Sequence, residues 1–325
     1  MCQGLRRNKG RLSSLLPFLA TVISASIILT GSLSFVSFRQ AQAAPPIAGS
    51  APAELEQASS SGEDTSYILL RPDVSEILLS QNASLRRAPA STTKLLTGLV
   101  ALQKLQPDEQ VTVGGEVLLE GSALGLRPGD RITVHQLLSA MYVLSANDAA
   151  AALAVKAAGS IEAFAAAMNK YANNIGLRDS HFTNPHGLPD PDHYTTAADL
   201  AKIAQAFIQN QELLTLAQQA KATIEWVDSS GRRRAVSVRN TNKLLSLYPG
   251  VQGLKTGTTT AAGQCLVIYF TSQEGDMLLV VLGAKQRYAT AVPLLDKGLA
   301  QLRLVNALKG FGIEPSGLLH SPGIF

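Results

Sequence analysis

The hydrophobic period changes twice along this chain, and this change limits the folds that it can adopt. Two short apolar runs at 67–70 and 77–79 flank the turn Pro72-Asp73 and indicate a strand hairpin. Apolar residues then recur at helical spacing through an Ala-rich centre, and short strand-like runs return in the last third. This order predicts an α+β fold in which the two ends of the domain share one sheet.

The same pattern predicts the individual elements. A helix opens at Ser91, and further helices are expected at 133–144, 148–157, 160–174, 196–208 and 288–304. Strands are expected at 222–228, 235–239, 251–256, 264–271 and 277–284. The Gly-, Pro-, Asn- and Asp-rich segment 176–195 is expected to be a long ordered loop, which is uncommon without a function. The predicted fold class is an antiparallel sheet of about five strands flanked by helices.

The N-terminus has the features of a targeting segment. Basic residues at 6–11 precede the uncharged run 12–38, and Ala41-Gln-Ala43 reads as a cleavage site, so residues 1–43 are predicted to be a signal peptide. Because about 20 apolar residues span a bilayer, run 12–38 could instead remain as a membrane anchor. Both alternatives predict export to the periplasm or to the outer face of the cytoplasmic membrane.

Composition beyond the targeting segment argues against a nucleic-acid surface. Five of the 28 Lys and Arg residues and no acidic residue lie in 1–43, so the other 23 bases face 24 acids. Residues 44–64, rich in Ala, Pro, Ser and Glu, are predicted to be a flexible linker. Residues 65–305 are predicted to be the folded domain and residues 306–325 a C-terminal tail. Cys265 is the only cysteine after the targeting segment, so no disulfide is expected within the domain.

Ser91-Thr-Thr-Lys94 is the first motif that could carry chemistry. Residues three apart lie on one helix face, so the hydroxyl and the amine can touch. A serine hydroxyl becomes a good nucleophile when a neighbour takes its proton, and a lysine can do so if burial or another cation lowers its pKa. The alternative is a helix-capping Ser with a surface Lys.

Two more polar motifs interrupt apolar segments. Ser145-Ala-Asn147 lies between two predicted helices, where it could also be a helix end followed by a capping residue. Lys255-Thr-Gly257 lies on a predicted strand, where the glycine would let another backbone approach closely. The alternative for Lys255 is an exposed side chain on an edge strand.

In this order the three motifs form the signature of penicillin-binding proteins and class A β-lactamases. With their flanks, and with Asn184-Pro-His-Gly-Leu188 and Asp192-His-Tyr-Thr-Thr196, they resemble the low-molecular-weight D-alanyl-D-alanine carboxypeptidases over about 65–305. The resemblance implies the penicillin-recognising, serine β-lactamase-like fold and no cofactor or metal. It also implies peptidoglycan stem peptides as substrates and β-lactam antibiotics as covalent inhibitors.

The resemblance also implies roles for four catalytic residues. Ser91 would attack the carbonyl between the two D-alanines and form an acyl-enzyme, with Lys94 as its general base. Ser145 would relay a proton toward the leaving amine. Asn147 would hold Lys94 and the substrate amide in place.

Five further residues would bind the substrate according to the resemblance. Lys255 and Thr256 would bind the terminal carboxylate, and Lys255 would also lower the pKa of the general base. The strand at 255–258, which includes Gly257, would pair with the substrate backbone, and the N–H of Thr258 would share the oxyanion hole with that of the nucleophile. Arg287 would bind the same carboxylate, or it could simply be an exposed Arg at a helix start.

Two related enzyme classes remain open at this point. The chain stops soon after its final helix, and Ala261-Ala-Gly-Gln-Cys-Leu-Val267 resembles the single-domain D,D-endopeptidases, which cut peptidoglycan cross-links. A class A β-lactamase needs a loop glutamate to activate water, whereas loop 177–195 holds Asp179, Asp190 and Asp192 but no Glu. This argues against efficient hydrolysis of β-lactams.

Two functions outside this enzyme group are disfavoured. A β-lactam sensor without turnover does not need the complete set of Lys94, Ser145 and Lys255. A zinc site could use His181, His186 and His193, but their spacing fits no helical His pair and the loop that holds them is rich in Pro and Gly.

Overall fold

A computed structural model of the chain describes residues 64–311. The predicted targeting segment at 1–43, nearly all of the predicted linker and most of the predicted tail lie outside the described residues. Among residues 64–311, no single helix is long and apolar enough to cross a membrane. Helices α3 (Asn147–Ala158) and α4 (Ile161–Asn174) reach that length and hydropathy only as a pair, which bends by 83° at the break between them.

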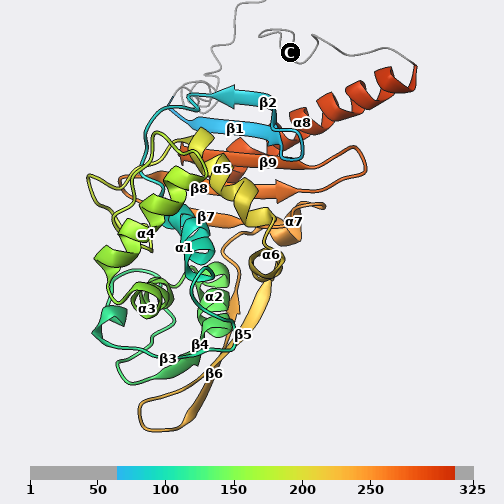
Figure 1. The fold of residues 1–325 in the computed structure, drawn as a ribbon. Coiled ribbons are helices and arrows are strands. Elements are labelled where there is room, and N and C mark those ends of the chain that lie inside the picture. Colours follow the sequence, from blue (N-terminus) through green and yellow to red (C-terminus); the bar gives the residue numbers. More distant parts are fainter. Residues whose placement is uncertain (1–63, 312–325) are drawn as a thin grey trace, which may run out of the picture. The chain divides into compact units, whose positions relative to one another are not determined.

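The larger sheet joins the two ends of the described chain, as the sequence predicts (Figure 1). Its strand order is β2-β1-β9-β8-β7, and every neighbouring pair is antiparallel. The strands are β1 (Ser66–Arg71), β2 (Glu76–Gln81), β7 (Lys255–Thr259), β8 (Gly263–Phe270) and β9 (Met277–Ala284). This five-stranded antiparallel sheet with flanking helices confirms the predicted fold class.

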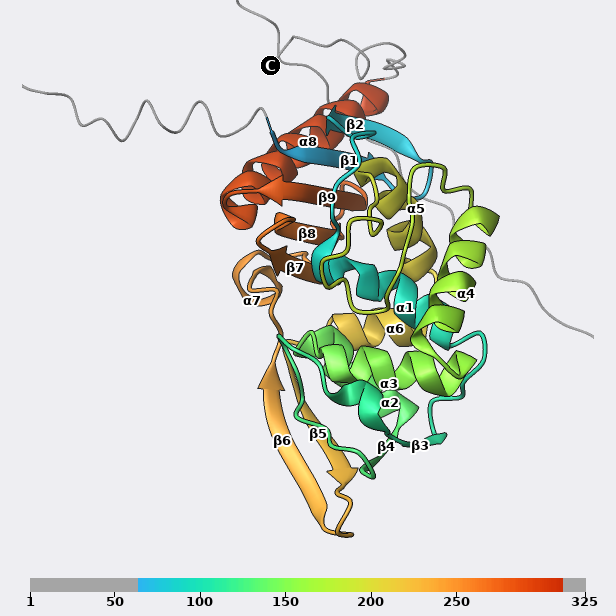
Figure 2. The same ribbon diagram turned by 90° about the vertical axis from the view of Figure 1, so that its left-hand side faces the viewer.

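Strand β9 shows why the sheet is buried on both faces. Because successive strand side chains point to opposite faces, Val280 packs in the core on the side of α1 and α5, whereas Val281 packs in the core that includes Leu295 of α8. In Figure 2, α8 covers one face of this sheet and α1 and α5 lie on the other. The continuous apolar run of β9 is therefore that of a strand covered on both sides.

Most of the other elements of the described chain are helices. Besides α3 and α4, they are the 3₁₀ helix η1 (Ala90–Thr93), α1 (Lys94–Ala101), α2 (Val134–Val143), α5 (Ala197–Ile208), α6 (Gln211–Ala217), α7 (Leu244–Leu247), α8 (Arg287–Gly310) and the 3₁₀ helix η2 (Gly115–Val117). The N-termini of α2, α4 and α5 are capped by Thr133, Ser160 and Thr196, each of which accepts a backbone N–H in the first turn. These caps place the predicted helix starts within a residue or two.

A second, smaller sheet has the order β3-β4-β5-β6. It contains β3 (Gln110–Thr112), β4 (Arg131–Thr133), β5 (Lys221–Val227) and β6 (Arg233–Arg239). The β5–β6 hairpin was predicted from the sequence. Strands β3 and β4 were not, because three residues are too few to show a period of two.

The strand predicted at 251–256 is wrong in its start. Strand β7 begins only at Lys255, and Val251 forms an isolated bridge with Phe270. Gly250 and Gly253 adopt φ values of 93° and 116°, which regular strand residues do not have. The chain therefore turns twice before β7 begins.

The final helix is longer than predicted. It was expected to end at 304, with a tail from 306, but α8 continues to Gly310. Leu302 and Val305 are buried on its inner face, and Asn306 Nδ2 donates to the Glu274 carbonyl at 2.9 Å. These contacts stabilise an extra turn beyond the predicted end.

Candidate active site

Ser91 and Lys94 lie where η1 passes into α1. Lys94 Nζ donates to Ser91 Oγ at 2.9 Å, so the predicted contact across one helix turn is present. Lys94 is 0% exposed, which excludes the alternative of a surface lysine. A buried amine beside a hydroxyl is the arrangement that nucleophile activation needs.

The amine of Lys94 is held by two more acceptors. It donates to Asn147 Oδ1 at 2.8 Å and to the His186 carbonyl at 2.7 Å. Burial, and then the positive charge of Lys255, lower the pKa of Lys94 well below its ordinary value, although Asp148 acts in the opposite direction. The lowered pKa favours the neutral amine, which is the form that can accept a proton.

A second Ser–Lys pair faces the first. Lys255 Nζ donates to Ser145 Oγ and to the Thr256 carbonyl, both at 2.9 Å. Strand β7 is the edge strand of the larger sheet, yet Lys255 is only 1% exposed. Ser145 has a φ of 68°, a left-handed conformation that is uncommon for non-glycine residues.

We expect the burial of Lys255 to make stability depend on pH. Burial, and then the charge of Arg287, lower its pKa from 10.5 to about 7, so between these pH values the unfolded chain binds more protons and stability rises with pH. Relative to a Lys255→Met variant, the native chain should gain about 2 kcal/mol in free energy of unfolding between about pH 7 and about pH 9. Urea unfolding of both proteins at both pH values measures this gain. If the native chain and the variant differ in free energy of unfolding by the same amount at both pH values, Lys255 has an ordinary pKa.

Glycine at position 257 lets β7 lie directly against η1. A Cβ added there would lie 2.8 Å from Ser91 N, 3.0 Å from Ala90 Cβ and 3.1 Å from Thr92 N. These distances are shorter than van der Waals contact allows. The predicted close approach at Gly257 is thus a packing requirement that sets the distance between the strand and the nucleophile.

A Gly257→Val variant should therefore lose activity more than stability. The added side chain must push β7 away from Ser91, and a displacement of about 1 Å in a catalytic site costs about 100-fold in rate. The measurement is the rate at which a labelled penicillin acylates the protein. Gly115→Ala is a matched control, because nothing lies within 4 Å of a Cβ added there. Equal rates for the two variants would show that the approach of β7 is not needed.

Arg287 is brought to the same place from the start of α8. Its backbone N and its Nε both donate to Gln264 Oε1 at 3.1 Å, and Nη1 donates to the Cys265 carbonyl at 2.8 Å. Its Nη2 contacts Thr258 Oγ1. The guanidinium is therefore held over the end of β7, where a carboxylate bound to that strand would meet it.

These residues surround one pocket of about 360 Å³. The pocket is lined by Ser91, Ser122, Ser145, Thr241, Lys243, Thr256, Gly257, Thr258, Gln264, Arg287 and Tyr288. Of the nine predicted site residues, six line it directly. The other three, Lys94, Asn147 and Lys255, stand behind this lining and bond to it or to one another.

One side of the pocket is formed by Thr241, Lys243 and Tyr288, which were not predicted from the sequence. Thr241 Oγ1 lies 2.7 Å from Thr256 Oγ1, and Tyr288 Oη donates to the Thr241 carbonyl at 3.0 Å. The polar run at 240–243 between a strand and a short helix is the only sequence signal for it. That signal indicates a loop, and only the pairing of β7 shows which site the loop borders.

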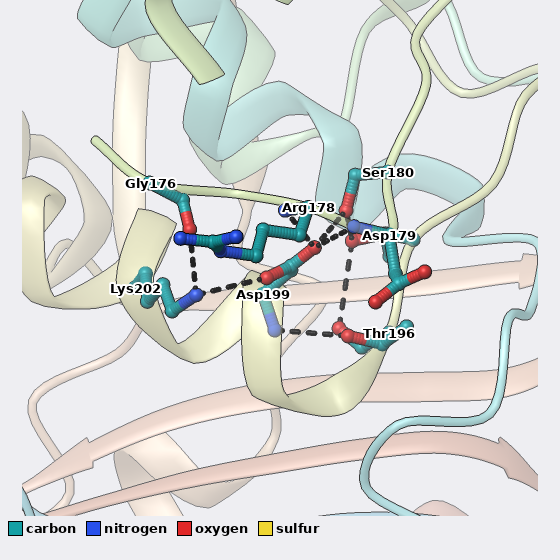
Figure 3. Close-up of polar contacts among 8 residues, drawn as sticks. Gly176, Arg178, Asp179, Ser180, Thr196, Asp199 and Lys202 are labelled. Atoms are coloured by element: carbon teal, nitrogen blue, oxygen red, sulfur yellow. Dashed lines mark hydrogen bonds and ion pairs between the residues drawn. The ribbon is translucent and has the colours of Figure 1, made fainter. Parts of the chain in front are cut away.

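The long loop 176–195 has a structural connection to the site, because its His186 carbonyl holds Lys94. Figure 3 shows how Asp199 of α5 fixes the start of this loop. Asp199 Oδ2 accepts from the backbone N–H of Arg178 and Asp179 and from Ser180 Oγ, at 3.1, 2.8 and 2.9 Å. Burial alone would raise the pKa of Asp199, but these bonds, with Lys202, lower it.

An Asp199→Ala variant is expected to lose about 3 kcal/mol of stability, since buried donors of the loop would have no acceptor. The lowered pKa means that this stabilisation is present at neutral pH and is lost as the pH falls through the folded-state pKa. Urea unfolding measures the loss. Asp190→Ala is the control, because Asp190 is exposed and its carboxylate caps only the Asp192 N–H. A loss no larger than that of the control would show that Asp199 does not hold the loop.

The three loop histidines serve as hydrogen-bond partners within the fold. His193 Nε2 lies 2.9 Å from Thr93 Oγ1, and His186 Nδ1 accepts from the Leu188 N–H at 3.3 Å. Burial lowers the pKa of His193 to about 4 and that of His186 to about 3. Among residues 64–311, no group of three or more His, Cys, Asp or Glu side chains is arranged to hold a metal ion.

Comparisons with known proteins agree with this geometry. A family model described as D-alanyl-D-alanine carboxypeptidase matches residues 53–286. The D-alanyl-D-alanine carboxypeptidase DacF of Bacillus subtilis is 33% identical over 250 residues, which are 74% of this chain and 63% of that protein. DacA of Escherichia coli K12 is 34% identical over 269 residues, which are 77% of this chain and 65% of that protein. The chain thus spans just under two thirds of the length of these relatives.

A solved structure has the same fold. The crystal structure of the Streptomyces K15 DD-transpeptidase superposes with a TM-score of 0.68 at 31% sequence identity. The match covers 72% of this chain and 96% of the other chain.

Proposed function

Because the chain belongs to the D-alanyl-D-alanine carboxypeptidase family, we propose that it is a serine peptidase that removes the terminal D-alanine from peptidoglycan stem peptides. The observation that carries this proposal is the fully buried Lys94 amine, 2.9 Å from Ser91 Oγ at the floor of the pocket. In this proposal, the nine site residues have the roles that the sequence predicts for them.

The first half of the reaction forms an ester. Ser91 Oγ attacks the carbonyl carbon of the bond between the two D-alanines, and neutral Lys94 takes the hydroxyl proton. The C–N bond breaks, and the proton that Lys94 accepted is relayed through Ser145 to the leaving amine, so that free D-alanine departs. Lys255, beside Ser145, supplies positive charge on the side where the substrate carboxylate binds.

The second half releases the shortened peptide. Water attacks the ester carbonyl and gives a proton to Lys94, the bond to Ser91 Oγ breaks, and Lys94 returns that proton to the serine. Thr256, Thr258 and Arg287 line the end of the pocket at which the terminal carboxylate would bind, which favours a peptide that ends there. A β-lactam presents its own carboxylate and carbonyl to the same groups and would be a covalent inhibitor.

The loop carboxylates favour a peptidase over a β-lactamase. Asp179 forms an ion pair with Arg86 at 2.9 Å, and Asp190 and Asp192 are exposed. A deacylating glutamate of the class A type has no counterpart in loop 177–195. Slow release of a bound β-lactam is therefore part of the proposal.

The site of action is proposed from the substrate and from the N-terminal sequence. Peptidoglycan lies outside the cytoplasmic membrane, and residues 1–43 have the composition of a signal peptide or an anchor. We therefore place the enzyme in the periplasm or on the outer face of that membrane. Membrane association, if run 12–38 is retained, would follow from its length.

The direct test uses the full chain in mild detergent and a soluble pentapeptide that ends in D-alanyl-D-alanine. Free D-alanine should appear, and preincubation with benzylpenicillin should stop it. The same peptide ending in L-alanine is the substrate control and should release nothing. If D-alanine is not released but a cross-linked muropeptide dimer is cut, the endopeptidase alternative replaces this proposal.

A further inference from the structure

One face of the β5–β6 hairpin packs on the core over part of its length, and the other face is turned to solvent. Residues directly opposite in an antiparallel pair lie on the same face. Ala222 pairs with Val238, and Ile224 pairs with Val236; Ile224 and Val238 are buried in the core. The alternate positions of both strands therefore face solvent.

Four exposed cations lie on this solvent face. At one end of the hairpin, Lys221 is directly opposite Arg239. At the other end, Arg233 and Arg131 of β4 lie on either side of Val227, because both pair with it. Within residues 64–311, none of these four cations forms an ion pair. Among the residues of β5 and β6 that lie on this face, Glu225 is the one carboxylate, and it is opposite Ala235.

Protection of a sheet edge does not account for this arrangement. Charged residues on edge strands prevent unwanted strand pairing, and β6 is an edge strand. However, Arg131 does not lie at an edge, because it pairs with Thr112 of β3 on one side and with Val227 of β5 on the other. Like charges placed directly opposite each other, as Lys221 and Arg239 are, destabilise a sheet. The fold alone therefore gives no reason for this cluster.

The solvent face of the hairpin ends next to the active-site pocket. Strand β6 ends at Arg239, and Thr241, two residues further, lines the pocket beside Lys243. Figure 2 shows the hairpin running from its free tip up to the chain that continues into α7 and β7. A strand of seven residues is about 23 Å long, so the cations follow a path of that order away from the site.

We propose that the solvent face of Arg131, Lys221, Arg233 and Arg239 binds the peptidoglycan polymer outside the catalytic pocket. This inference rests on the proposed function, because it takes the same polymer as the substrate. Each free stem peptide ends in a carboxylate before and after cleavage, so the polymer is a scaffold with repeated negative charges. Attraction of several stems to this face would raise the local concentration of the stem that enters the pocket.

The test compares a triple variant with a matched one in the full chain. Arg131→Gln, Arg233→Gln and Arg239→Gln together remove three charges from the face. Lys104→Gln, Lys170→Gln and Lys297→Gln remove three exposed charges elsewhere. Co-sedimentation with insoluble peptidoglycan at low ionic strength should weaken about tenfold for the face variant and little for the control. Both should acylate with labelled penicillin and release D-alanine from a soluble pentapeptide as the native chain does.

Two results would overturn the proposal. One is equal sedimentation of the face variant and the native chain, and the other is an equal loss in the control variant, which would indicate general charge attraction. Tighter binding of the native chain to anionic phospholipid vesicles than to peptidoglycan would assign the face to a membrane instead. Failure of the native chain to release D-alanine would count against the proposed reaction alone, since sedimentation does not depend on turnover.

Discussion

Replacing Ser91 with Ala is expected to abolish covalent reaction with penicillin and to lower D-alanine release by at least about 10⁴-fold. The structure contains two Ser–Lys pairs, with equal N–O distances of 2.9 Å, so distance alone does not say which serine attacks. Ser91 is at the start of a helix, where backbone N–H groups can stabilise the developing oxyanion. Its lysine is fully buried, and burial together with the positive charge of Lys255 lowers the pKa of that lysine well below its ordinary value.

The measurement that separates the two serines is the mass of the protein after incubation with benzylpenicillin. The native chain should gain one adduct, Ser91→Ala should gain none, and Ser145→Ala should gain it slowly. Ser122→Ala is the control, because Ser122 lines the same pocket and its side chain makes no hydrogen bond in the described structure. A full adduct on Ser91→Ala together with none on Ser145→Ala would exchange the proposed roles.

The sequence was sufficient to predict the larger sheet and the long helices. Strand β9 is an apolar run of eight residues, whereas helix α5 has a helical apolar period over twelve residues and an N-terminal cap at Thr196. The short elements β3 and α7 lack that repetition. Their conformation depends on pairing or packing with distant parts of the chain, which local sequence does not show.

The candidate site also has some contacts that local sequence predicts and others that it does not. Ser91 and Lys94 were predicted to touch because one helix turn sets their spacing. The contact between Lys94 and the His186 carbonyl joins residues 92 positions apart, and no local period indicates it. The burial of Lys255 on an edge strand was also not predictable, since Ser145 and the chain around it cover the lysine only after folding.

Replacing Lys94 with Met is expected to lower the acylation rate by about 10²- to 10⁴-fold, which is the usual contribution of a general base. Methionine fills much of the same buried space but cannot take the proton from Ser91. Asn147 Oδ1 and the His186 carbonyl would each lose a donor, so about 1–3 kcal/mol of stability should be lost as well. Urea unfolding must therefore accompany the kinetics, under conditions in which the variant remains folded.

The pH profile shows whether the lost rate reflects proton transfer or only a disturbed fold. If Lys94 is the base, acylation of the native chain falls as the pH drops through the lowered pKa of Lys94, and the residual rate of Lys94→Met lacks that step. A variant that loses rate only because its structure is disturbed would keep the native pH dependence at a lower acylation rate. Lys170→Met, an exposed lysine in the middle of another helix, is the control and should keep both rate and profile. A native acylation rate in Lys94→Met would assign the proton transfer to Lys255, whose pKa of about 7 also suits a base near neutral pH.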